Sequence, residues 1–336
     1  MVSTQTWLMN ECREGSKKAL IIGFTGQDGV YLTKFLARKN YKIYGTSRDL
    51  EKSMSNTLES YDIKDNITKL ELDPLSYDSI YKIIEQIKPD EIYNLSAQSS
   101  VGKSFKIPIQ TINSISLVTL NILEACRVLD NDSRIYNAGS SEVFGDTRNR
   151  PADEDTQFNP VSPYALAKSF ATKQVSMYRD LYNVYACTGI LFNHESPLRA
   201  NQYVTKKIIS SACRIANGSN ENLKLGNINI YRDWGYAPDY VDAMWRMLQL
   251  EKPQDFVIGT GQSTSLKEFT AEAFRFFDLD WEEHTDIDPG LLRSSDIEVS
   301  SCNPAKAKSL LGWVAKTNLQ ELIRKMIEYE MENYEE

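Results

Sequence analysis

Apolar residues in the first half of the chain fall into two alternating patterns. Short continuous runs rich in β-branched and aromatic residues predict strands, and longer stretches with apolar positions three and four residues apart predict helices. The predicted strands are 19–24, 42–47, 67–72, 91–95, 134–138 and 185–191, and the predicted helices are 30–40, 77–87, 108–129 and 163–181. Strands that alternate with helices in this way build βαβ units. The pattern therefore predicts an α/β fold with a Rossmann-like, doubly wound parallel sheet.

The pattern becomes less regular after Asn193. Helices are predicted at 204–216, 241–250, 266–277 and 319–329, with polar loops between them. This half indicates a smaller C-terminal α/β lobe that closes over the sheet. We expect an N-terminal extension at 1–18, a Rossmann-like domain mainly at 19–192 and a smaller lobe mainly at 193–336. The extension has charged residues without a continuous apolar core, so it does not resemble a signal peptide.

Composition narrows the classes of function. The 336 residues include 46 acidic and 38 basic side chains, for a net charge of -8, which argues against a general binder of nucleic acid. No apolar run is long enough to span a bilayer, so we expect no membrane partner. The five cysteines are scattered and only two histidines are present, which predicts neither a disulfide framework nor a metal site. A cytoplasmic protein fits this composition best.

Three glycines, Gly23, Gly26 and Gly29, follow the first predicted strand. A strand, a glycine loop and then a helix place backbone N–H groups at a helix N-terminus, where the pyrophosphate of a dinucleotide binds. The Gly-x-x-Gly-x-x-Gly spacing is typical of extended short-chain dehydrogenases. Glycine also marks ordinary turns, so the spacing predicts a dinucleotide site only together with its flanking strand and helix.

Ser47, Arg48 and Asp49 close the second predicted strand. A carboxylate at this position binds the adenosine ribose of NAD, whereas a small residue followed by Arg suits the 2′-phosphate of NADP. We therefore expect NADP rather than NAD. The alternative is that Arg48 is a solvated surface charge and that Asp49 binds the ribose.

Tyr164 and Lys168 lie four residues apart on one face of a predicted helix. An ammonium group at this spacing favours the phenolate, and such a tyrosine can act as a general base. The same spacing recurs at Tyr203 and Lys207, so the spacing alone is a weak signal. The first pair is distinguished by Pro163 at a likely helix start and by the Ser140-Ser-Glu142 segment beyond the fifth strand, at the sheet edge where such folds bind ligands.

Ser140, Glu142 and Tyr164 supply the groups that a sugar-nucleotide dehydratase needs. A hydroxyl bonds a sugar oxygen, a phenol moves the proton of that oxygen, and a carboxylate makes a second proton transfer. Carbonyl reduction or 4-epimerisation needs only hydroxyl, Tyr and Lys, whereas removal of a C5 proton and loss of a C6 hydroxyl require another acid or base. The alternative is that Glu142 only caps or salt-bridges a loop.

From about residue 18 to residue 330 the sequence resembles the GDP-mannose 4,6-dehydratases, a family of extended short-chain dehydrogenases. The segments that carry the resemblance are Gly23-Phe-Thr-Gly-Gln-Asp-Gly29, Tyr93-Asn-Leu-Ser-Ala-Gln-Ser99, Gly139-Ser-Ser-Glu-Val-Phe-Gly145, Ser162-Pro-Tyr-Ala-Leu-Ala-Lys168, Gly189-Ile-Leu-Phe-Asn-His-Glu-Ser-Pro197 and Arg232-Asp-Trp-Gly235. The Asn-His-Glu-Ser-Pro segment is the most specific of them. Ser140 stands where the family has its catalytic Thr, and Glu142, Tyr164 and Lys168 occupy the expected catalytic positions.

The resemblance also implies binding residues. Cofactor contacts are implied for Gly23, Thr25, Gly26, Gln27, Asp28, Gly29, Arg48, Asp73, Leu95, Ala97, Gln98, Ser99, Tyr164, Lys168, His194 and Arg199. Substrate contacts are implied for Ser99, Ser140, Glu142, Asn193, Lys207, Arg232 and Arg293. The cations among them would neutralise a diphosphate in an acidic protein, although each also has an alternative role as a surface or snorkelling side chain.

Several positions depart from the family pattern. Ser100 replaces a usual His, Gln110 a usual Tyr and Asp49 a second Arg, and residues 293–296 differ from the usual Arg-Pro-x-Glu. The substrate pocket is therefore expected to accept GDP-D-mannose or a close relative, with a GDP-manno-heptose as an alternative. The family also implies a homodimer or homotetramer and a place in deoxysugar biosynthesis.

The expected reaction is an internal hydride transfer. Tyr164 takes the C4 hydroxyl proton, a hydride moves from C4 to NADP, Glu142 removes the C5 proton, water leaves from C6 and the hydride returns to C6. A UDP-glucuronate decarboxylase is a rival that the Asn193-His-Glu-Ser-Pro197 segment disfavours. A reductase or epimerase is disfavoured by Glu142. A non-catalytic dinucleotide-binding protein would leave the catalytic cluster unexplained.

Overall fold

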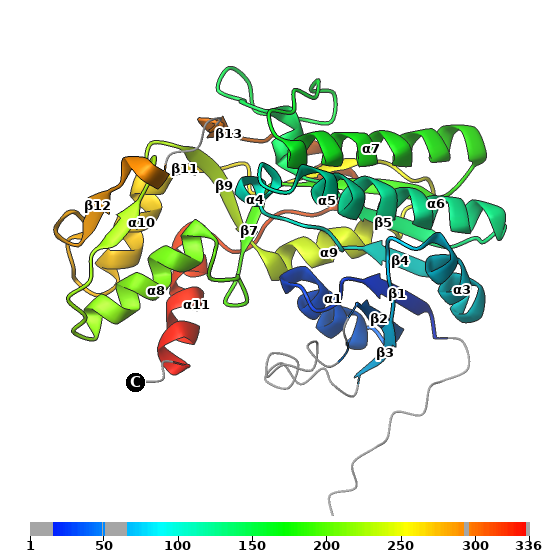
Figure 1. The fold of residues 1–336 in the computed structure, drawn as a ribbon, viewed down its shortest axis with the longest axis horizontal. Coiled ribbons are helices and arrows are strands. Elements are labelled where there is room, and N and C mark those ends of the chain that lie inside the picture. The colour runs from blue at the N-terminus through cyan, green and yellow to red at the C-terminus, as the bar shows by residue number, and fades with distance from the viewer. Residues whose placement is uncertain (1–15, 49, 51–65, 292–295, 334–336) are drawn as a thin grey trace, which may run out of the picture.

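Seven parallel strands form the large sheet of the protein (Figure 1). The computed structural model describes residues 16–48, 50, 66–291 and 296–333. The strands are β1 (Lys18–Ile22), β2 (Lys42–Ser47), β3 (Ile67–Glu71), β4 (Glu91–Asn94), β5 (Arg134–Ala138), β6 (Ala186–Leu191) and β10 (Phe256–Ile258), in the spatial order β10-β6-β5-β4-β1-β2-β3. The six predicted strands and the doubly wound fold are confirmed. The seventh strand, β10, was not predicted and comes from the second half of the chain.

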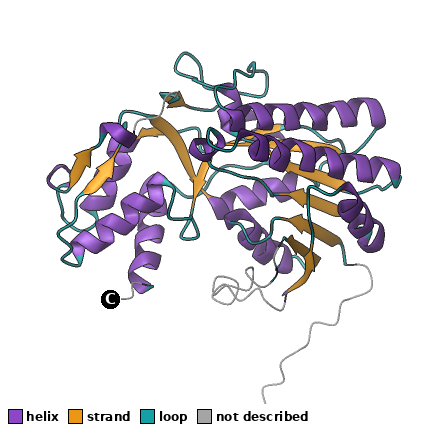
Figure 2. Ribbon diagram, in the orientation of Figure 1, coloured by secondary structure: helices purple, strands orange, loops and turns teal. Residues whose placement is uncertain are grey.

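Helices cover both faces of this sheet (Figure 2). On one face α1 (Gln27–Ala37) packs against α9 (Ala237–Met247), and on the other lie α3 (Tyr77–Ile87), α6 (Val118–Val128) and α7 (Pro163–Tyr182). Alternate residues of β1 are fully buried on opposite sides: Ile21 belongs to the α1 and α9 core, and Leu20 belongs to the α3, α6 and α7 core. A strand buried on both faces is a continuous apolar run, which is why β1 was recognisable in the sequence.

The predicted helix at 108–129 is confirmed, and the structure adds a π-helical turn within it. The structure has α5 (Pro108–Ile112), a π-helical turn η3 (Asn113–Leu117) and then α6, with a separate short helix α4 (Val101–Ser104) before them. Thr111 and Ser114 bond to backbone carbonyls with their hydroxyls, and Ser114 also accepts from Gln98 N. Such side-chain bonds compete with regular helical pairing, and π turns often occur beside functional sites.

The smaller lobe is built around a central strand, β9 (Tyr231–Tyr236), which pairs with β7 (Asn193–Glu195), β11 (Ser263–Ser265) and β13 (Val299–Ser300). A second pair of strands joins β8 (Leu223–Leu225) to β12 (Thr285–Ile287). The apolar core of the lobe lies among α8 (Val204–Ala216), α10 (Leu266–Arg275) and α11 (Leu319–Glu332). The helices of this lobe were predicted, and its two- to six-residue strands were not.

Short helical turns complete the description: η4 (Ser141–Phe144), η5 (Trp281–Glu283), η6 (Pro289–Leu291) and η7 (Ala307–Leu311). Within the described ranges, no helix combines the length and apolar character that crossing a bilayer requires.

Candidate active site

The glycine loop lies between β1 and the N-terminus of α1, and a side chain has no room at two of its glycines, Gly23 and Gly29. Gly23 has φ 91°, and a Cβ on it would lie 2.9 Å from the Ser96 backbone. A Cβ on Gly29 would lie 2.5 Å from the Phe24 backbone. Gly26 occupies the N-cap of α1, and no side chain caps the helix there. The uncapped N–H groups and the partial positive charge of this helix end form a site suited to a phosphate.

The loop is fastened to β7 by buried polar contacts. Asp28 Oδ2 lies 2.9 Å from His194 Nε2, and the Gln27 amide donates to the His194 carbonyl over 3.1 Å. Ser196 Oγ donates to Gln27 Oε1 over 2.7 Å. The family resemblance implied a separate cofactor contact for each of Gln27, Asp28 and His194. The structure brings them together and joins the phosphate loop to the Asn-His-Glu-Ser-Pro segment.

His194 faces hydrogen-bond acceptors at both ring nitrogens. Nδ1 lies 2.8 Å from the Phe192 carbonyl and Nε2 faces the Asp28 carboxylate. Burial opposes a charged ring, but the Asp28 carboxylate prevails and raises the pKa of His194 above its usual value. Burial would likewise raise the pKa of Asp28, but His194 holds it below its usual value. An imidazolium donating from both nitrogens accounts for this geometry.

The other residues expected at the cofactor follow the carboxyl ends of neighbouring strands. Arg48 is exposed at the end of β2, Asp73 follows β3 and accepts from Leu75 N, and Thr25 is exposed on the glycine loop. Leu95, Ala97, Gln98 and Ser99 follow β4. The Gln98 amide donates to Thr111 and Ser100 inside the protein, so Gln98 supports the loop through contacts with its own chain.

The four residues expected to be catalytic meet at the carboxyl end of β5. Ser140 is the N-cap of η4, where its hydroxyl accepts from the Glu142 amide over 3.3 Å. Tyr164 lies in the first turn of α7, which Ser162 caps and Pro163 begins. Lys168 donates to the Ala138 carbonyl over 2.6 Å, and its ammonium nitrogen lies 5.9 Å from the centre of the Tyr164 ring. One helix and one turn thus position all four groups.

Burial dominates the ionisation of this cluster. It raises the pKa of Tyr164, while the Ser140 hydroxyl acts in the opposite sense and the Glu142 carboxylate raises that pKa further. It also lowers the pKa of Lys168 to about 8, against an opposing effect of Asp28. The effect of Asp28 on Lys168 shows that the glycine loop lies within electrostatic range of the cluster. A phenol in this setting keeps its proton until a cation stabilises the phenolate.

Arg199 lies beside the cluster, between Glu195 and Tyr203. Its Nε lies 2.8 Å from Glu195 Oε2, and its guanidinium stacks 3.7 Å from the centre of the Tyr203 ring. Within the described chain this buried Nε makes no well-aligned hydrogen bond. Tyr203 in turn contacts Ser99, with 2.7 Å between their hydroxyl oxygens. From the sequence, Tyr203 was recognised only as part of the repeated four-residue spacing of Tyr and Lys. Glu195 was not predicted as a functional residue, although it lies inside the Asn193-His-Glu-Ser-Pro197 segment.

The residues expected to bind the sugar nucleotide are more dispersed. Asn193 lies half-buried on β7 opposite Trp234 of β9. Arg232 is buried on β9 and donates to the Tyr231 carbonyl, and Lys207 donates to the Lys224 carbonyl on β8 over 2.6 Å. Arg293 lies outside the described residues. The structure therefore places three of these side chains in the smaller lobe.

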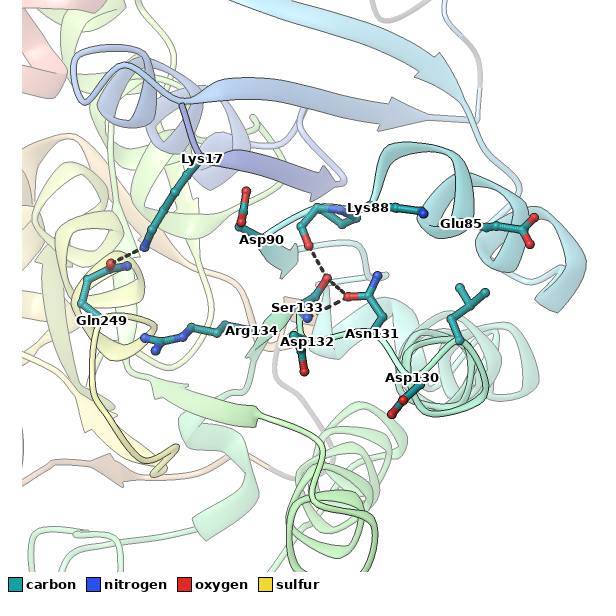
Figure 3. A pocket seen from close by; sticks show the side chains of 12 residues that line it. Lys17, Glu85, Lys88, Asp90, Asp130, Asn131, Asp132, Ser133, Arg134 and Gln249 are labelled. Atoms are coloured by element: carbon teal, nitrogen blue, oxygen red, sulfur yellow. Dashed lines mark hydrogen bonds between the residues drawn. The ribbon is translucent and has the colours of Figure 1, made fainter. Parts of the chain in front are cut away.

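A hollow at the opposite edge of the sheet is separate from this cluster (Figure 3). It lies at the amino ends of β1, β4 and β5. Its polar groups are largely bonded to one another: Lys17 contacts Gln249, and Asn131 accepts from the Ser133 amide. Ligands of doubly wound sheets bind at the carboxyl edge, so this hollow is a solvated rim of the sheet and the candidate site is the Tyr164 cluster.

The chain is similar to known proteins over most of its length. The family model described as GDP-mannose 4,6 dehydratase matches residues 20–326. GDP-mannose 4,6 dehydratase 1 of Arabidopsis thaliana is 43% identical over 328 residues, covering 94% of this chain and 90% of that protein. The GDP-mannose 4,6 dehydratase of Dictyostelium discoideum is 40% identical, covering 95% and 97%.

Solved structures support the fold. The UDP-glucose 4-epimerase of Thermotoga maritima aligns with a TM-score of 0.82 at 20% identity, covering 93% of this chain and 98% of that one. The dTDP-glucose 4,6-dehydratase of Bacillus anthracis aligns with a TM-score of 0.83 at 16% identity, covering 95% and 97%. The family and the dehydratase class predicted from the sequence are confirmed by the sequence matches. The chain belongs to the GDP-mannose 4,6-dehydratase family.

Proposed function

We propose that the protein converts GDP-D-mannose, or a close GDP-hexose, into the GDP-4-keto-6-deoxy sugar with a bound NADP. The observation that carries this proposal is the convergence of Ser140, Glu142, Tyr164 and Lys168 beside the glycine loop. The carboxylate is the informative member, because an elimination requires an acid or base that simple carbonyl reduction does not.

The residues around the glycine loop fit a dinucleotide. Gly23 and Gly29 have no space for a side chain, and no side chain caps the N-terminus of α1. Exposed Arg48 at the end of β2 suits a 2′-phosphate. NADP is therefore proposed over NAD. When bound, it accepts a hydride from C4 of the sugar and returns it to C6.

The side chains supply the proton transfers. Tyr164 takes the proton of the C4 hydroxyl as the C4–H bond breaks, and Lys168 stabilises the phenolate. Ser140 holds the C4 oxygen. The new ketone makes the C5 proton acidic, and Glu142 removes it and delivers a proton to the departing C6 hydroxyl, which leaves as water. The proton that Tyr164 took from the C4 hydroxyl would go to C5 as the hydride returns to C6, so that one water is lost and no net oxidation occurs.

The direct test is to incubate the purified protein with GDP-mannose and NADP+ and to measure the loss of one water by mass spectrometry. Glu142→Gln is the matched control, because it keeps the size of the side chain and removes its basicity. GDP-manno-heptose and UDP-glucuronate serve as competing substrates. Carbon dioxide release from UDP-glucuronate, or dinucleotide binding without turnover of any GDP-hexose, would refute the proposal.

We also propose that the protein forms a homodimer or a homotetramer. Leu166, Phe170, Met177 and Leu181 lie along one side of α7 and are 43–69% exposed, and Ile109 on the adjacent α5 is 74% exposed. An apolar surface of this kind is a candidate interface with a second copy. Light scattering of the wild type and of a Phe170→Glu variant tests this proposal, which a monomeric wild type would refute.

A reducing, cytoplasmic setting is part of the same proposal. The four cysteines within the described ranges, Cys126, Cys187, Cys213 and Cys302, are buried and unpaired. Unpaired thiols are typical of proteins in reducing compartments.

A further inference from the structure

Tyr203 connects the two lobes at the edge of the catalytic cluster. It immediately precedes α8 in extended backbone conformation, with φ -88° and ψ 139°. Its phenol oxygen lies 2.7 Å from Ser99 Oγ, a residue 104 positions earlier on the loop after β4. The contact therefore joins the carboxyl edge of the large sheet to the first turn of the smaller lobe.

The Tyr203 ring is held in a defined orientation. The Arg199 guanidinium stacks 3.7 Å from the ring centre, close enough for a cation–π contact. Arg199 pairs with Glu195, and the same Glu195 oxygen accepts from Thr205 Oγ1 over 2.8 Å. Glu195 is only 1% exposed. A buried carboxylate thus fixes the arginine that fixes the ring.

The hydroxyl of Tyr203 contacts Ser99 on the loop after β4, at the carboxyl edge of the sheet where the catalytic cluster also lies. Burial is the main cause that raises the pKa of Tyr164, and Tyr203 and Arg199 make smaller contributions to it. Ser99 is exposed and Tyr203 is partly exposed. The hydrogen bond between the two hydroxyls uses only one of their two protons, so one donor and several lone pairs remain for a ligand.

We propose that Tyr203 is a positioning residue for the hexose of the substrate, which it orients together with Ser99 at the edge of the cluster of Ser140 and Tyr164. This inference rests on the proposed function. The phenol fixes the Ser99 hydroxyl, and the two together bond sugar hydroxyls that Tyr164 does not contact. The GDP portion of the substrate is not part of this contact.

The test is a Tyr203→Phe variant, which keeps the ring stacked on Arg199 and removes only the hydroxyl. Its dissociation constant and KM for GDP-mannose are expected to rise about five- to tenfold, the effect of losing a hydrogen bond. Its kcat is expected to fall less than about threefold, and its affinity for GDP alone is expected to change less than about twofold. Titration calorimetry with GDP and with GDP-mannose separates the two ligands.

Two further variants sharpen the experiment. Ser99→Ala should weaken GDP-mannose binding to a similar extent, and the double variant should be no worse than either single variant, since the two hydroxyls act as one unit. Tyr81→Phe is the matched control, because Tyr81 is a partly exposed tyrosine on α3 that packs against Tyr77. It should change neither affinity nor turnover.

The outcomes separate this inference from the proposed function. If the wild type turns over GDP-mannose and Tyr203→Phe binds it with unchanged affinity, the inference is wrong and the proposed function stands. Equal weakening of GDP and GDP-mannose would overturn the inference as well, because it would indicate a general structural role. A wild type that does not bind GDP-mannose would overturn both.

Discussion

The chain contains two Tyr-x-x-x-Lys segments, and the structure uses them differently. Tyr164 lies inside the first turn of α7, and Lys168 reaches back to the carbonyl of Ala138 at the end of β5. Tyr203 lies just before α8, and Lys207 donates to the Lys224 carbonyl on β8 in the smaller lobe. The spacing is the same, but only in the first pair do phenol and ammonium share a buried site beside the glycine loop.

The contrast indicates that the location of the helix, and not the spacing, brings a phenol and an ammonium group together in a buried site. The α7 helix lies on one face of the large sheet and begins near the carboxyl end of β5, and both Tyr164 and Lys168 are less than 10% exposed. The second pair spans the beginning of α8 at the lobe boundary. Tyr203 contacts Ser99, whereas Lys207 donates to the Lys224 carbonyl on β8. In our proposals, the same four-residue step serves proton transfer at Tyr164 and substrate positioning at Tyr203.

The largest expected contrast is between the two tyrosines. Tyr164→Phe should lower kcat by roughly 10³- to 10⁴-fold, because the C4 hydroxyl loses its base. Tyr203→Phe should leave kcat within about threefold of the wild type, since this phenol only holds the sugar. Steady-state kinetics with GDP-mannose measure both, and similar losses of kcat in the two variants would break the distinction.

Glu142→Gln should separate oxidation of the sugar from elimination. The amide cannot take the C5 proton, so the yield of dehydrated product should fall by roughly 10²- to 10³-fold. Oxidation at C4 needs only Tyr164 and Lys168, so reduced nicotinamide should accumulate in a single turnover with substrate. Absorbance of the reduced nicotinamide is the measurement. Full dehydratase activity in this variant would contradict this role and indicate that Glu142 only caps its loop.

Substitution of Lys168 and substitution of Lys207 should have different effects on the stability of the protein as well as on its activity. Burial lowers the pKa of Lys168 to about 8, whereas the unfolded chain titrates near the ordinary value of about 10.4. Between these values the unfolded chain binds more protons, so the stability contributed by this site rises with pH. Below about pH 8 the buried charge costs on the order of 3 kcal/mol.

Lys168→Met should therefore raise the free energy of unfolding of the ligand-free protein at pH 7 while abolishing most activity. Lys207→Met removes a charge at the lobe surface and should change stability by about 0.5 kcal/mol or less. Denaturant unfolding at pH 7 and pH 10 provides the measurement. A Lys168→Met variant less stable than the wild type at both pH values would contradict the assigned cost of burial.

The smallest expected effect concerns the other buried cation near the glycine loop. Asp28 raises the pKa of His194 above its usual value, so the pair stabilises the fold fully below about pH 6.5. That contribution is lost as the pH rises through the folded-state pKa. His194→Gln should therefore lower the unfolding midpoint more at pH 6 than at pH 9, by about 2 °C. Calorimetry at the two pH values tests the sign, and an equal loss would contradict it.

The strands that could be predicted most clearly from the sequence are those whose apolar residues are most buried. The strands β1 and β6 of the large sheet are almost entirely buried, and they could be recognised because Leu20, Ile21 and Ile190 belong to continuous apolar runs. The smaller lobe uses strands such as β7 and β11, which are three residues long. A three-residue strand has no period to detect, and its existence depends on pairing with β9.

The candidate site was predictable where one helix carries the residues. Tyr164, Lys168 and the Ser140–Glu142 turn were found because the motif and its flanking elements are local in sequence. The contact of Tyr203 with Ser99 and the pairing of Asp28 with His194 join residues more than 100 positions apart. No spacing rule encodes such contacts, because they arise only when the smaller lobe packs against the sheet.

The fastening of the glycine loop to β7 has a consequence for the lifetime of the bound nucleotide. Gln27 and Asp28 hold Ser196 and His194 across the boundary between the lobes, so the smaller lobe cannot swing away from the nucleotide without breaking a buried ion pair. A dinucleotide that ends each catalytic cycle in its starting redox state has no need to exchange. We therefore expect the enzyme to retain its nucleotide through purification and to release it only when the protein unfolds.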